Sequence, residues 1–210
     1  MTGDDPTTPI AVRATLGGRA LRGWRRLRCA ACGLPTDVCV CDELPTVATV
    51  TRIAVVMHRI ESVRSTNTGR LVVKVVADSV LRVRGARDDV PTEAPPGRRL
   101  VLFPSESARP LCGADADGAT TLVVPDGSWA QARRIARRDP WAREAECVSL
   151  HPTAASRYGL RRNPREGGLC TIEAVAAALA VLEGPSAAQP LLDAFELWRA
   201  RAATVRRPTR

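Results

Sequence analysis

The fold class follows from one segment of the chain, Thr120-Thr121-Leu122-Val123-Val124-Pro125-Asp126-Gly127-Ser128-Trp129-Ala130-Gln131-Ala132-Arg133-Arg134. It opens with a short, β-branched apolar run that ends at a proline, a pattern typical of a buried strand. The helix pattern that follows runs from Ser128 to Arg138 and stops at Asp139-Pro140. A strand that passes directly into a helix is half of a βαβ unit, so the segment favours a parallel sheet.

The same alternation of strands and helices extends to both sides of this segment. The other expected strands are residues 51–57, 80–83, 100–104 and 146–150, and the other expected helices are residues 68–79, 171–182 and 190–203. The sequence therefore predicts an α/β domain with a mainly parallel sheet flanked by helices. Because such sheets bind ligands beyond the carboxyl ends of their strands, the residues after each strand form the candidate site.

Length and composition fit a single globular domain. The chain has 210 residues, 45% hydrophobic and 25% charged, which excludes collagen-like, coiled-coil and fully disordered classes. Its longest apolar run, residues 174–182, is too short to span a membrane, and the N-terminal residues lack the apolar segment of a secretory signal. We therefore expect a cytoplasmic protein with no membrane partner.

The charge is strongly basic. Lysine and arginine number 31 against 22 acidic residues, for a net charge of +9, and Lys74 is the only lysine. Such a balance favours an anionic partner, with nucleic acid ahead of acidic lipid. A generically basic protein is the plain alternative.

Four of the seven cysteines form a compact cluster, Cys29-x2-Cys32-x6-Cys39-x-Cys41. Four thiolates at this spacing can enclose one tetrahedral zinc ion and leave no open position, so we predict a structural zinc site. An iron–sulfur cluster and metal-free thiols are the alternatives.

We divide the chain into a basic, partly disordered extension (1–28), this zinc-knuckle segment (29–45) and the main domain (46–205). Metal loss is expected to unfold the knuckle and spare the main core.

Polar residues gather directly after the predicted strands. His58 follows one strand, and the sequence leaves its role open between ligand binding, titration and simple hydrogen bonding. Asp126 follows another, where a carboxylate either caps the next helix or accepts a proton from a substrate. Trp129 either packs in the interior or forms a wall for a flat base.

Arginines and glycines mark two further surfaces. In helix 128–138 four arginines stand in two i, i+4 pairs and form a broad basic face suited to phosphate: Arg133, Arg134, Arg137 and Arg138. Before helix 171–182, Gly167-Gly168 permits close backbone approach to a ligand, and Cys170 or Thr171 lies at the N-cap.

In this order the motifs resemble the DTW-domain family over residues 29–185. The resemblance rests on the cysteine cluster and on five further motifs: His58 with Glu61, Asn67-Thr68-Gly69-Arg70-Leu71, Phe103-Pro104, Asp126-Gly127-Ser128-Trp129, and the segment from Tyr158 to Ala174. Three positions depart from the family pattern. The name-giving threonine is Ser128, which keeps the hydroxyl; the proline usual after the histidine is Arg59; and a serine common before Thr171 is Cys170.

The resemblance implies a tRNA-uridine aminocarboxypropyltransferase with a SPOUT-like fold that is knotted near the cofactor site. Such enzymes transfer the 3-amino-3-carboxypropyl group of S-adenosylmethionine to N3 of a uridine in tRNA and release methylthioadenosine. Because the N3 proton must leave, a base is needed, and Asp126 is the expected one. Ser128 and Trp129 are expected to shape the catalytic site around it.

The resemblance also indicates where the cofactor and the RNA bind. Cofactor contacts are expected from the turns after two strands and before helix 171–182: Phe103, Pro104, Ser105, Pro125, Gly127, Arg161, Glu166, Gly168, Leu169, Cys170 and Thr171. The expected RNA-binding residues are arginines: Arg64, Arg133, Arg134, Arg137, Arg162 and Arg165. The sequence settles neither the modified uridine nor the oligomeric state.

Two rival functions fit the same residues. A SPOUT-like RNA methyltransferase would release S-adenosylhomocysteine in place of methylthioadenosine. A non-catalytic, zinc-containing RNA-binding protein would bind tRNA with a strong salt dependence, but it does not need polar clusters at three successive strand ends. Activity on another RNA also stays open.

Overall fold

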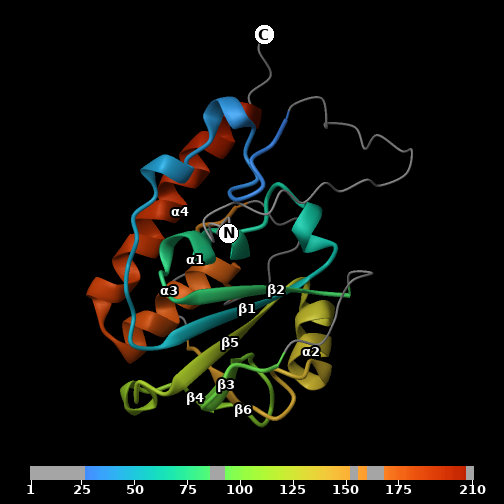
Figure 1. Cartoon of the computed structure of the whole chain (residues 1–210), viewed down its shortest axis with the longest axis vertical. Helices are drawn as coiled ribbons and strands as arrows, with labels where there is room; N and C mark the ends of the chain where they lie inside the picture. Colours follow the sequence, from blue (N-terminus) through green and yellow to red (C-terminus); the bar gives the residue numbers. More distant parts are fainter. Residues whose placement is uncertain (1–26, 86–92, 152–155, 160–167, 207–210) are drawn as a thin grey trace, which may run out of the picture.

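The structure is a computed structural model, and it describes residues 27–85, 93–151, 156–159 and 168–206. Six strands form one sheet in the order β2-β1-β5-β3-β6-β4, and all the neighbours are parallel (Figure 1). The strands are β1 Arg52–His58, β2 Ser79–Arg84, β3 Arg98–Leu102, β4 Arg109–Pro110, β5 Thr120–Asp126 and β6 Glu146–Ser149. The predicted α/β fold with a mainly parallel sheet is confirmed.

The α-helices are α1 Gly69–Val75, α2 Trp129–Arg138, α3 Thr171–Leu182 and α4 Pro185–Arg206. Helix α1 ends earlier than predicted because Val76 pairs with Val47 in an isolated β-bridge. Helix α4 begins before the predicted residue 190 and includes Pro190, whose missing N–H leaves one helical hydrogen bond unmade. In the part of the chain that the structure describes, no helix is long and apolar enough to cross a membrane.

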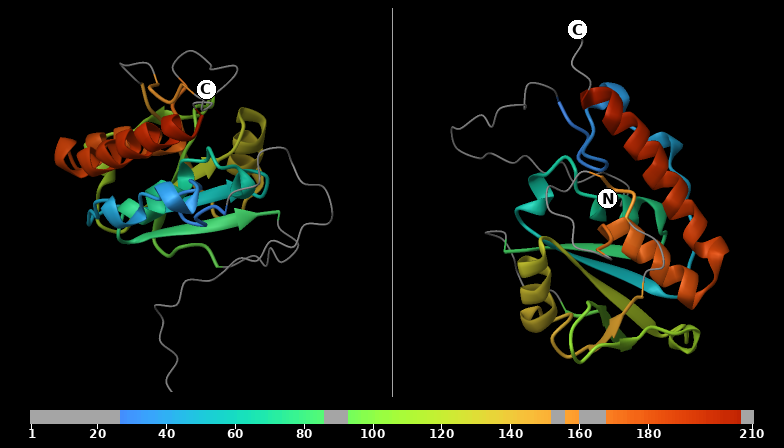
Figure 2. Two further views of the ribbon diagram at one scale, coloured as in Figure 1. Left: turned by 90° about the horizontal axis from the view of Figure 1, so that it is seen from above. Right: turned by 180° about the vertical axis from the view of Figure 1, so that it is seen from behind.

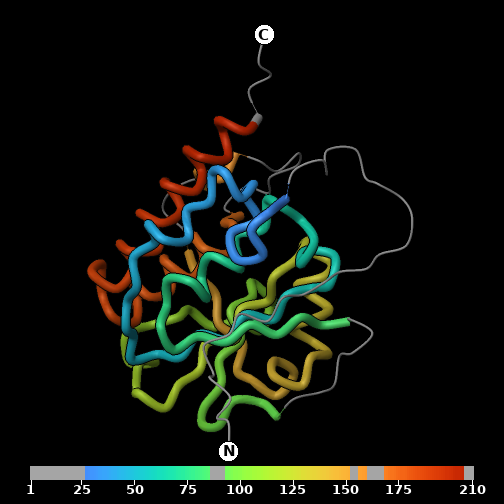
Figure 3. Tube along the Cα trace, turned by 45° about the horizontal axis from the view of Figure 1, so that its top comes forward, coloured from blue at the N-terminus to red at the C-terminus, as the bar shows by residue number. Residues whose placement is uncertain are grey.

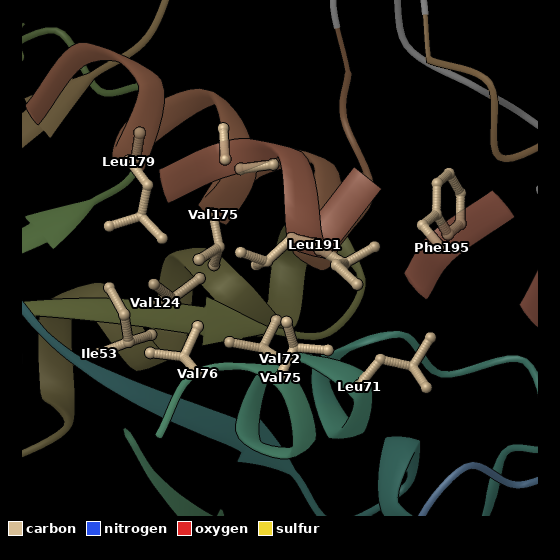
Figure 4. Close-up of a cluster of buried hydrophobic side chains, with 14 of the residues drawn as sticks. Ile53, Leu71, Val72, Val75, Val76, Val124, Val175, Leu179, Leu191 and Phe195 are labelled. Carbon is tan, nitrogen blue, oxygen red and sulfur yellow. The ribbon is translucent and has the colours of Figure 1, made fainter. Parts of the chain in front are cut away.

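The helices divide between the two faces of the sheet. Helices α1, α3 and α4 cover one face and bury the main hydrophobic core, whereas α2 covers the other (Figures 1 and 2). Figure 4 shows side chains of the three helices meeting over Ile53 of β1 and Val124 of β5. The core on the α2 face is smaller and is centred on Val123 of β5 and Ile135 of α2. The sheet therefore has one thickly covered face and one thinly covered face.

The cysteine segment packs into the main core. Cys32, Leu34 and Val40 belong to the same buried cluster as Trp198 of α4. The indole Nε1 of Trp198 donates a hydrogen bond to the carbonyl of Cys32 at 2.9 Å. Figure 3 shows this segment running beside α4. Because of this packing, we expect metal loss to disturb α4 as well, and the expectation that the main core is spared stays an untested prediction.

Two sequence predictions stay predictions. The proposed extension 1–28 falls almost wholly outside the described residues, which begin at 27. The knot near the cofactor site, implied by the family resemblance, is likewise an expectation about this fold.

Candidate functional site at the carboxyl ends of the strands

Asp126 ends β5 in the middle of the sheet, and its side chain is only 4% exposed. Its Oδ2 accepts a hydrogen bond from Nδ2 of Asn67 at 2.6 Å, and its Oδ1 accepts one from Oγ1 of Thr171 at 2.5 Å. Asn67 precedes α1, and Thr171 is the first residue of α3. Each oxygen of the carboxylate is held by a separate donor. Asp126 therefore ties the end of β5 to the starts of two helices.

The start of α1 lies unusually close to this carboxylate. A Cβ placed on Gly69 would lie 2.7 Å from Oδ2 of Asp126 and 3.0 Å from its Cγ, so any larger residue would require the carboxylate or the helix to shift. The backbone N–H of Ile172 donates to Oγ1 of Thr68 at 3.5 Å, which joins α1 directly to α3. The hydroxyl of Tyr158 donates to the carbonyl of Thr66 at 2.5 Å. Three chain segments thus converge on the end of β5.

Glu173 organises the start of α3. Its buried carboxylate accepts hydrogen bonds from the Ser156 hydroxyl at 2.5 Å, the Arg157 N–H at 2.7 Å and the Cys170 N–H at 2.9 Å. Of the two residues predicted near the N-cap of α3, Cys170 and Thr171, Cys170 is the N-cap, and burial raises the pKa of its thiol. The position of Glu173, three residues after a predicted N-cap, indicated a role in capping the helix. No pattern in the sequence indicated that Glu173 also accepts hydrogen bonds from residues 156 and 157.

The start of α2 is held by a reciprocal cap. Oγ of Ser128 accepts a hydrogen bond from the N–H of Gln131, whose side chain accepts one from the N–H of Ser128 at 2.8 Å. Trp129 packs edge-on against Phe103, with 6.0 Å between the ring centroids. The turn after β5 is therefore joined to the turn after β3.

His58 ends β1 beside Gly127, and its backbone pairs in register with Arg84 of β2. Its Nδ1 accepts a hydrogen bond from the N–H of Ile60 at 3.3 Å, which assigns the ring proton to Nε2. Partial burial and the surrounding arginines lower the pKa of His58. These arginines are Arg59, Arg84, Arg134 and Arg64. At neutral pH the imidazole is therefore uncharged, in a strongly positive environment.

The four predicted metal ligands come together. The Sγ atoms of Cys29, Cys32, Cys39 and Cys41 all lie within 4.8 Å of one another, with Cys29–Cys41 at 3.6 Å and Cys32–Cys39 at 3.7 Å. A tetrahedral ion with metal–sulfur bonds of about 2.3 Å spaces its sulfurs about 3.8 Å apart, so the cluster fits one ion. A multi-iron cluster spaces its thiolates farther apart, because different irons bind them. The cluster can therefore hold a single metal ion.

The backbone of the knuckle prepares this site. Gly33 adopts a φ of +76°, which lets its N–H turn back to donate to the Cys29 carbonyl at 2.9 Å. Although burial opposes ionisation, backbone N–H groups of Cys32 and Ala31 and the neighbouring thiols lower the pKa of Cys29 to about 7. Burial instead raises the pKa of Cys32 and of Cys41, so the four thiols of the knuckle are not equivalent.

Arg70 lies between the knuckle and Asp126. Its Nη1 donates to the carbonyl of Ala30, between the first two cysteines of the cluster, at 3.1 Å. Burial lowers the pKa of its guanidinium, while the charges of Asp126, Cys29 and Cys32 act to raise it. The cysteine segment is therefore electrostatically linked to the strand-end site.

A family model for the DTW domain matches residues 26–203. The chain belongs to the DTW-domain family. Its curated relatives include tRNA-uridine aminocarboxypropyltransferase 2 of Drosophila melanogaster, 34% identical over 76% of this chain and 68% of the relative. The protein of the same name in Macaca fascicularis is 27% identical over 83% of this chain and 67% of the relative. The chain thus spans about two thirds of their length. No solved structure matches it significantly.

The arginines of this DTW domain differ in their surroundings. Four on α2 are exposed and have no carboxylate partner among the described residues: Arg133, Arg134, Arg137 and Arg138. Arg64, in contrast, pairs with Glu61 at 3.0 Å, although its side chain stays 55% exposed. The predicted residues Arg161, Arg162, Arg165 and Glu166 lie outside the described part of the chain. The basic face expected on α2 is therefore present.

A groove of about 950 Å³ opens between α2 and the turn after β3 of the DTW domain. Three of the predicted cofactor residues line it, and so do two of the predicted RNA-binding arginines: Phe103, Pro104, Ser105, Arg133 and Arg137. The Sγ of Cys147 donates to the Phe103 carbonyl at 3.1 Å and holds the turn to β6. No local pattern marked this groove, since its walls come from separate parts of the chain.

Proposed function

We propose that this chain is a tRNA-uridine aminocarboxypropyltransferase, which transfers the 3-amino-3-carboxypropyl group of S-adenosylmethionine to N3 of a uridine in tRNA. The observation that carries the proposal is the cluster around Asp126, where the name-giving motif of the family meets Asn67 and Thr171. The activity named for the relatives and the basic face of α2 support it.

In the reaction, the terminal carbon of the aminocarboxypropyl group exchanges its bond to sulfur for a bond to nitrogen. The bond from N3 to the terminal carbon of the aminocarboxypropyl group forms as that carbon's bond to the sulfonium sulfur breaks. The sulfur keeps the electron pair, methylthioadenosine leaves, and N3 loses its proton. Because a sulfonium activates all three attached carbons, the orientation in which the protein holds the two substrates selects the transferred group. The protein must therefore position N3 and help its proton to leave.

Asp126 is our candidate for the group that accepts the N3 proton. Asn67 and Thr171 hold its carboxylate in one orientation at the end of β5. Ser128 and Trp129 start α2 next to it, and we propose that they shape the uridine pocket. A positioning role, in which Asp126 joins β5 to α1 and α3 without touching uridine, accounts for the same contacts. A pH–rate profile separates the two roles.

S-adenosylmethionine is proposed to bind where the turns after β3 and β5 meet the start of α3. Two contacts support this location because they bring the three segments to one edge of the sheet: Asp126 with Thr171, and Phe103 with Trp129. The described residues proposed for the site are Phe103, Pro104, Ser105, Pro125, Gly127, Gly168, Leu169, Cys170 and Thr171. Arg161 and Glu166 are proposed to complete it.

Arginines are proposed to bind the phosphates of tRNA. The net charge of +9 and the exposed Arg133, Arg134 and Arg137 of α2, which have no carboxylate partner in the described part of the chain, support this role. The full set is Arg64, Arg133, Arg134, Arg137, Arg162 and Arg165.

The metal is proposed to be a zinc ion with a structural role. Four thiolates complete a tetrahedron, so no position remains for a substrate. Burial of the cluster against α4 supports a role in folding. The cytoplasmic location expected from the sequence also stays a prediction.

The test is to incubate the protein with S-adenosylmethionine and unmodified bulk tRNA and to analyse nucleosides and small molecules by mass spectrometry. We expect a uridine heavier by one aminocarboxypropyl group and an equal amount of methylthioadenosine. A methylated nucleoside with S-adenosylhomocysteine would instead assign a methyltransferase. Tight tRNA binding with neither product would assign a non-catalytic RNA-binding protein.

A further inference from the structure

The groove beside α2 exists because the second face of the sheet is only partly covered. Helix α2 packs over β1 and β5, and beyond it Val101 of β3 and Cys147 of β6 form part of the groove lining. One wall is the turn from Phe103 to Ser107, and the other is α2 with residues 142–145. At about 950 Å³, the groove is at the upper end of the range for ligand pockets.

The rim of the groove is positively charged. Arg133 and Arg137 stand one helical turn apart on the side of α2 that lines it, and both are exposed. Arg143 adds a third guanidinium, which pairs at 3.1 Å with Glu144, and Glu106 is the acidic residue of the lining. Like charges spaced i, i+4 repel each other, and an anion in the groove would relieve that repulsion.

The interior of the groove combines apolar and polar groups in similar amounts. Ala136, Ala142 and Ala145 are among its apolar residues, Ser105 and Ser107 are among its polar ones, and Phe103 also lines it. Phe103 in turn touches Trp129 at the start of α2, next to the turn that holds Asp126. The groove therefore lies next to the candidate active site.

A groove with arginines on its rim and both polar and apolar groups along its lining suits one class of ligand. Single-stranded nucleic acid presents phosphates on one side and the faces of sugars and bases on the other. A double helix hides the stacked faces of its bases and presents phosphates, 2′-hydroxyls and base edges instead. We propose that the groove holds a single-stranded segment of the RNA substrate next to the acceptor uridine, with its phosphates on Arg133 and Arg137. This inference rests on the proposed function and adds the location and strandedness of the RNA.

Arg137 and its neighbour Arg138 provide a matched test. Both are exposed, both lie in the last turn of α2, and neither has a carboxylate partner among the described residues, but only Arg137 lines the groove. Binding of fluorescently labelled, unmodified bulk tRNA is measured by anisotropy from low to moderate salt. Each phosphate contact on a single strand contributes about 0.7 to the slope of log affinity against log salt. We expect Arg137→Gln to reduce that slope by about 0.7 and Arg138→Gln to leave it unchanged.

The double variant Arg133→Gln/Arg137→Gln is expected to reduce the slope by about 1.4 and to weaken binding about tenfold at physiological salt. A second variant, Ala136→Phe, fills the groove and keeps every charge. It is expected to weaken binding while the thermal unfolding midpoint changes little. If Arg137→Gln and Arg138→Gln weaken binding equally, or if Ala136→Phe binds as the parent does, the groove does not hold the RNA.

A competition experiment tests the strandedness. An unlabelled single-stranded oligouridylate is expected to displace tRNA from the parent protein, and a double-stranded RNA of equal phosphate content is expected to displace it less well. Equal displacement by the two competitors would overturn the proposal. These outcomes are independent of catalysis, since methylthioadenosine formation by the parent protein tests the proposed function separately.

Discussion

Asp126 and Thr171 stand 45 residues apart in the chain and 2.5 Å apart in space, with the threonine hydroxyl donating to the buried carboxylate. This contact fixes the first residue of α3 on the last residue of β5. Since Asn67 holds the other oxygen of the carboxylate, one side chain sets the relative positions of β5, α1 and α3. The candidate active site is therefore part of the junction between these elements.

Thr171→Val tests the strength of this junction. The substitution keeps the shape of the side chain but removes the donor, and a hydrogen bond to a buried charge contributes about 1.5–3 kcal/mol. We expect the free energy of unfolding, measured in urea, to fall by about that amount. Thr171→Ser should retain most of it. The exposed Thr204→Val is the control, and a Thr171→Val protein as stable as that control would contradict the assignment.

Asp126→Asn separates the two proposed roles of this residue. An amide in place of the carboxylate turns one NH2 group toward a donor, either Asn67 or Thr171, and it cannot accept the N3 proton. We expect transfer to be lost while tRNA affinity changes little. If Asp126 is the base, kcat of the parent falls as this carboxyl is protonated at low pH, and the residual activity of the variant lacks that limb. Near-parental turnover by the variant would exclude the base role.

Gly69→Ala tests the close approach of α1 to Asp126. The new Cβ would meet Oδ2 at 2.7 Å, and overpacking of this kind typically costs about 1–3 kcal/mol, more than the helix propensity gained. We expect a lower unfolding midpoint and reduced methylthioadenosine formation. Gly113→Ala is the matched control, because the nearest atom to its Cβ is 3.5 Å away. Equal behaviour of the two variants would show that α1 can move away without loss.

Metal removal tests the coupling of the knuckle to the core. Elemental analysis is expected to find one metal ion, zinc, per chain. Chelation, or the substitution Cys32→Ser, should lower the unfolding midpoint of the whole domain, because Cys32 is buried beside Trp198. Cys112→Ser, at an exposed cysteine outside the cluster, should keep both metal content and midpoint. Separate unfolding of residues 29–45 with an unchanged main transition would contradict this coupling.

The depressed pKa of Asp115 predicts how the free energy of unfolding depends on pH. Hydrogen bonds from Arg109, with smaller contributions from Cys112, hold the pKa of Asp115 well below its ordinary value of 3.8. Because the folded-state pKa is depressed, this contribution is complete above the ordinary value and is lost as the pH falls below it. The difference in urea stability between the parent and Asp115→Asn should therefore shrink from pH 7 to pH 3. A difference that stays constant would mean that charge plays no part in the contact.

Much of the architecture could be predicted from local pattern. In residues 120–138 an apolar run is followed by a capped helix, and this pattern depends only on residues that are neighbours in the chain. The parallel sheet that it predicts is confirmed. The four cysteines Cys29, Cys32, Cys39 and Cys41, chosen from their spacing alone, likewise lie close enough for one ion. Strand β4 escaped prediction because two residues carry no periodicity.

The sequence by itself determined the types and order of most of the elements, the basic charge and the cysteine cluster that could hold a metal ion, since each depends on residues close together in the chain. Only the tertiary structure decided that Asn67, Gly69 and Thr171 surround Asp126, that the knuckle packs on α4, and that a groove opens beside α2. These features depend on the order of the strands in the sheet. That order brings together residues far apart in the chain, and no local pattern records it.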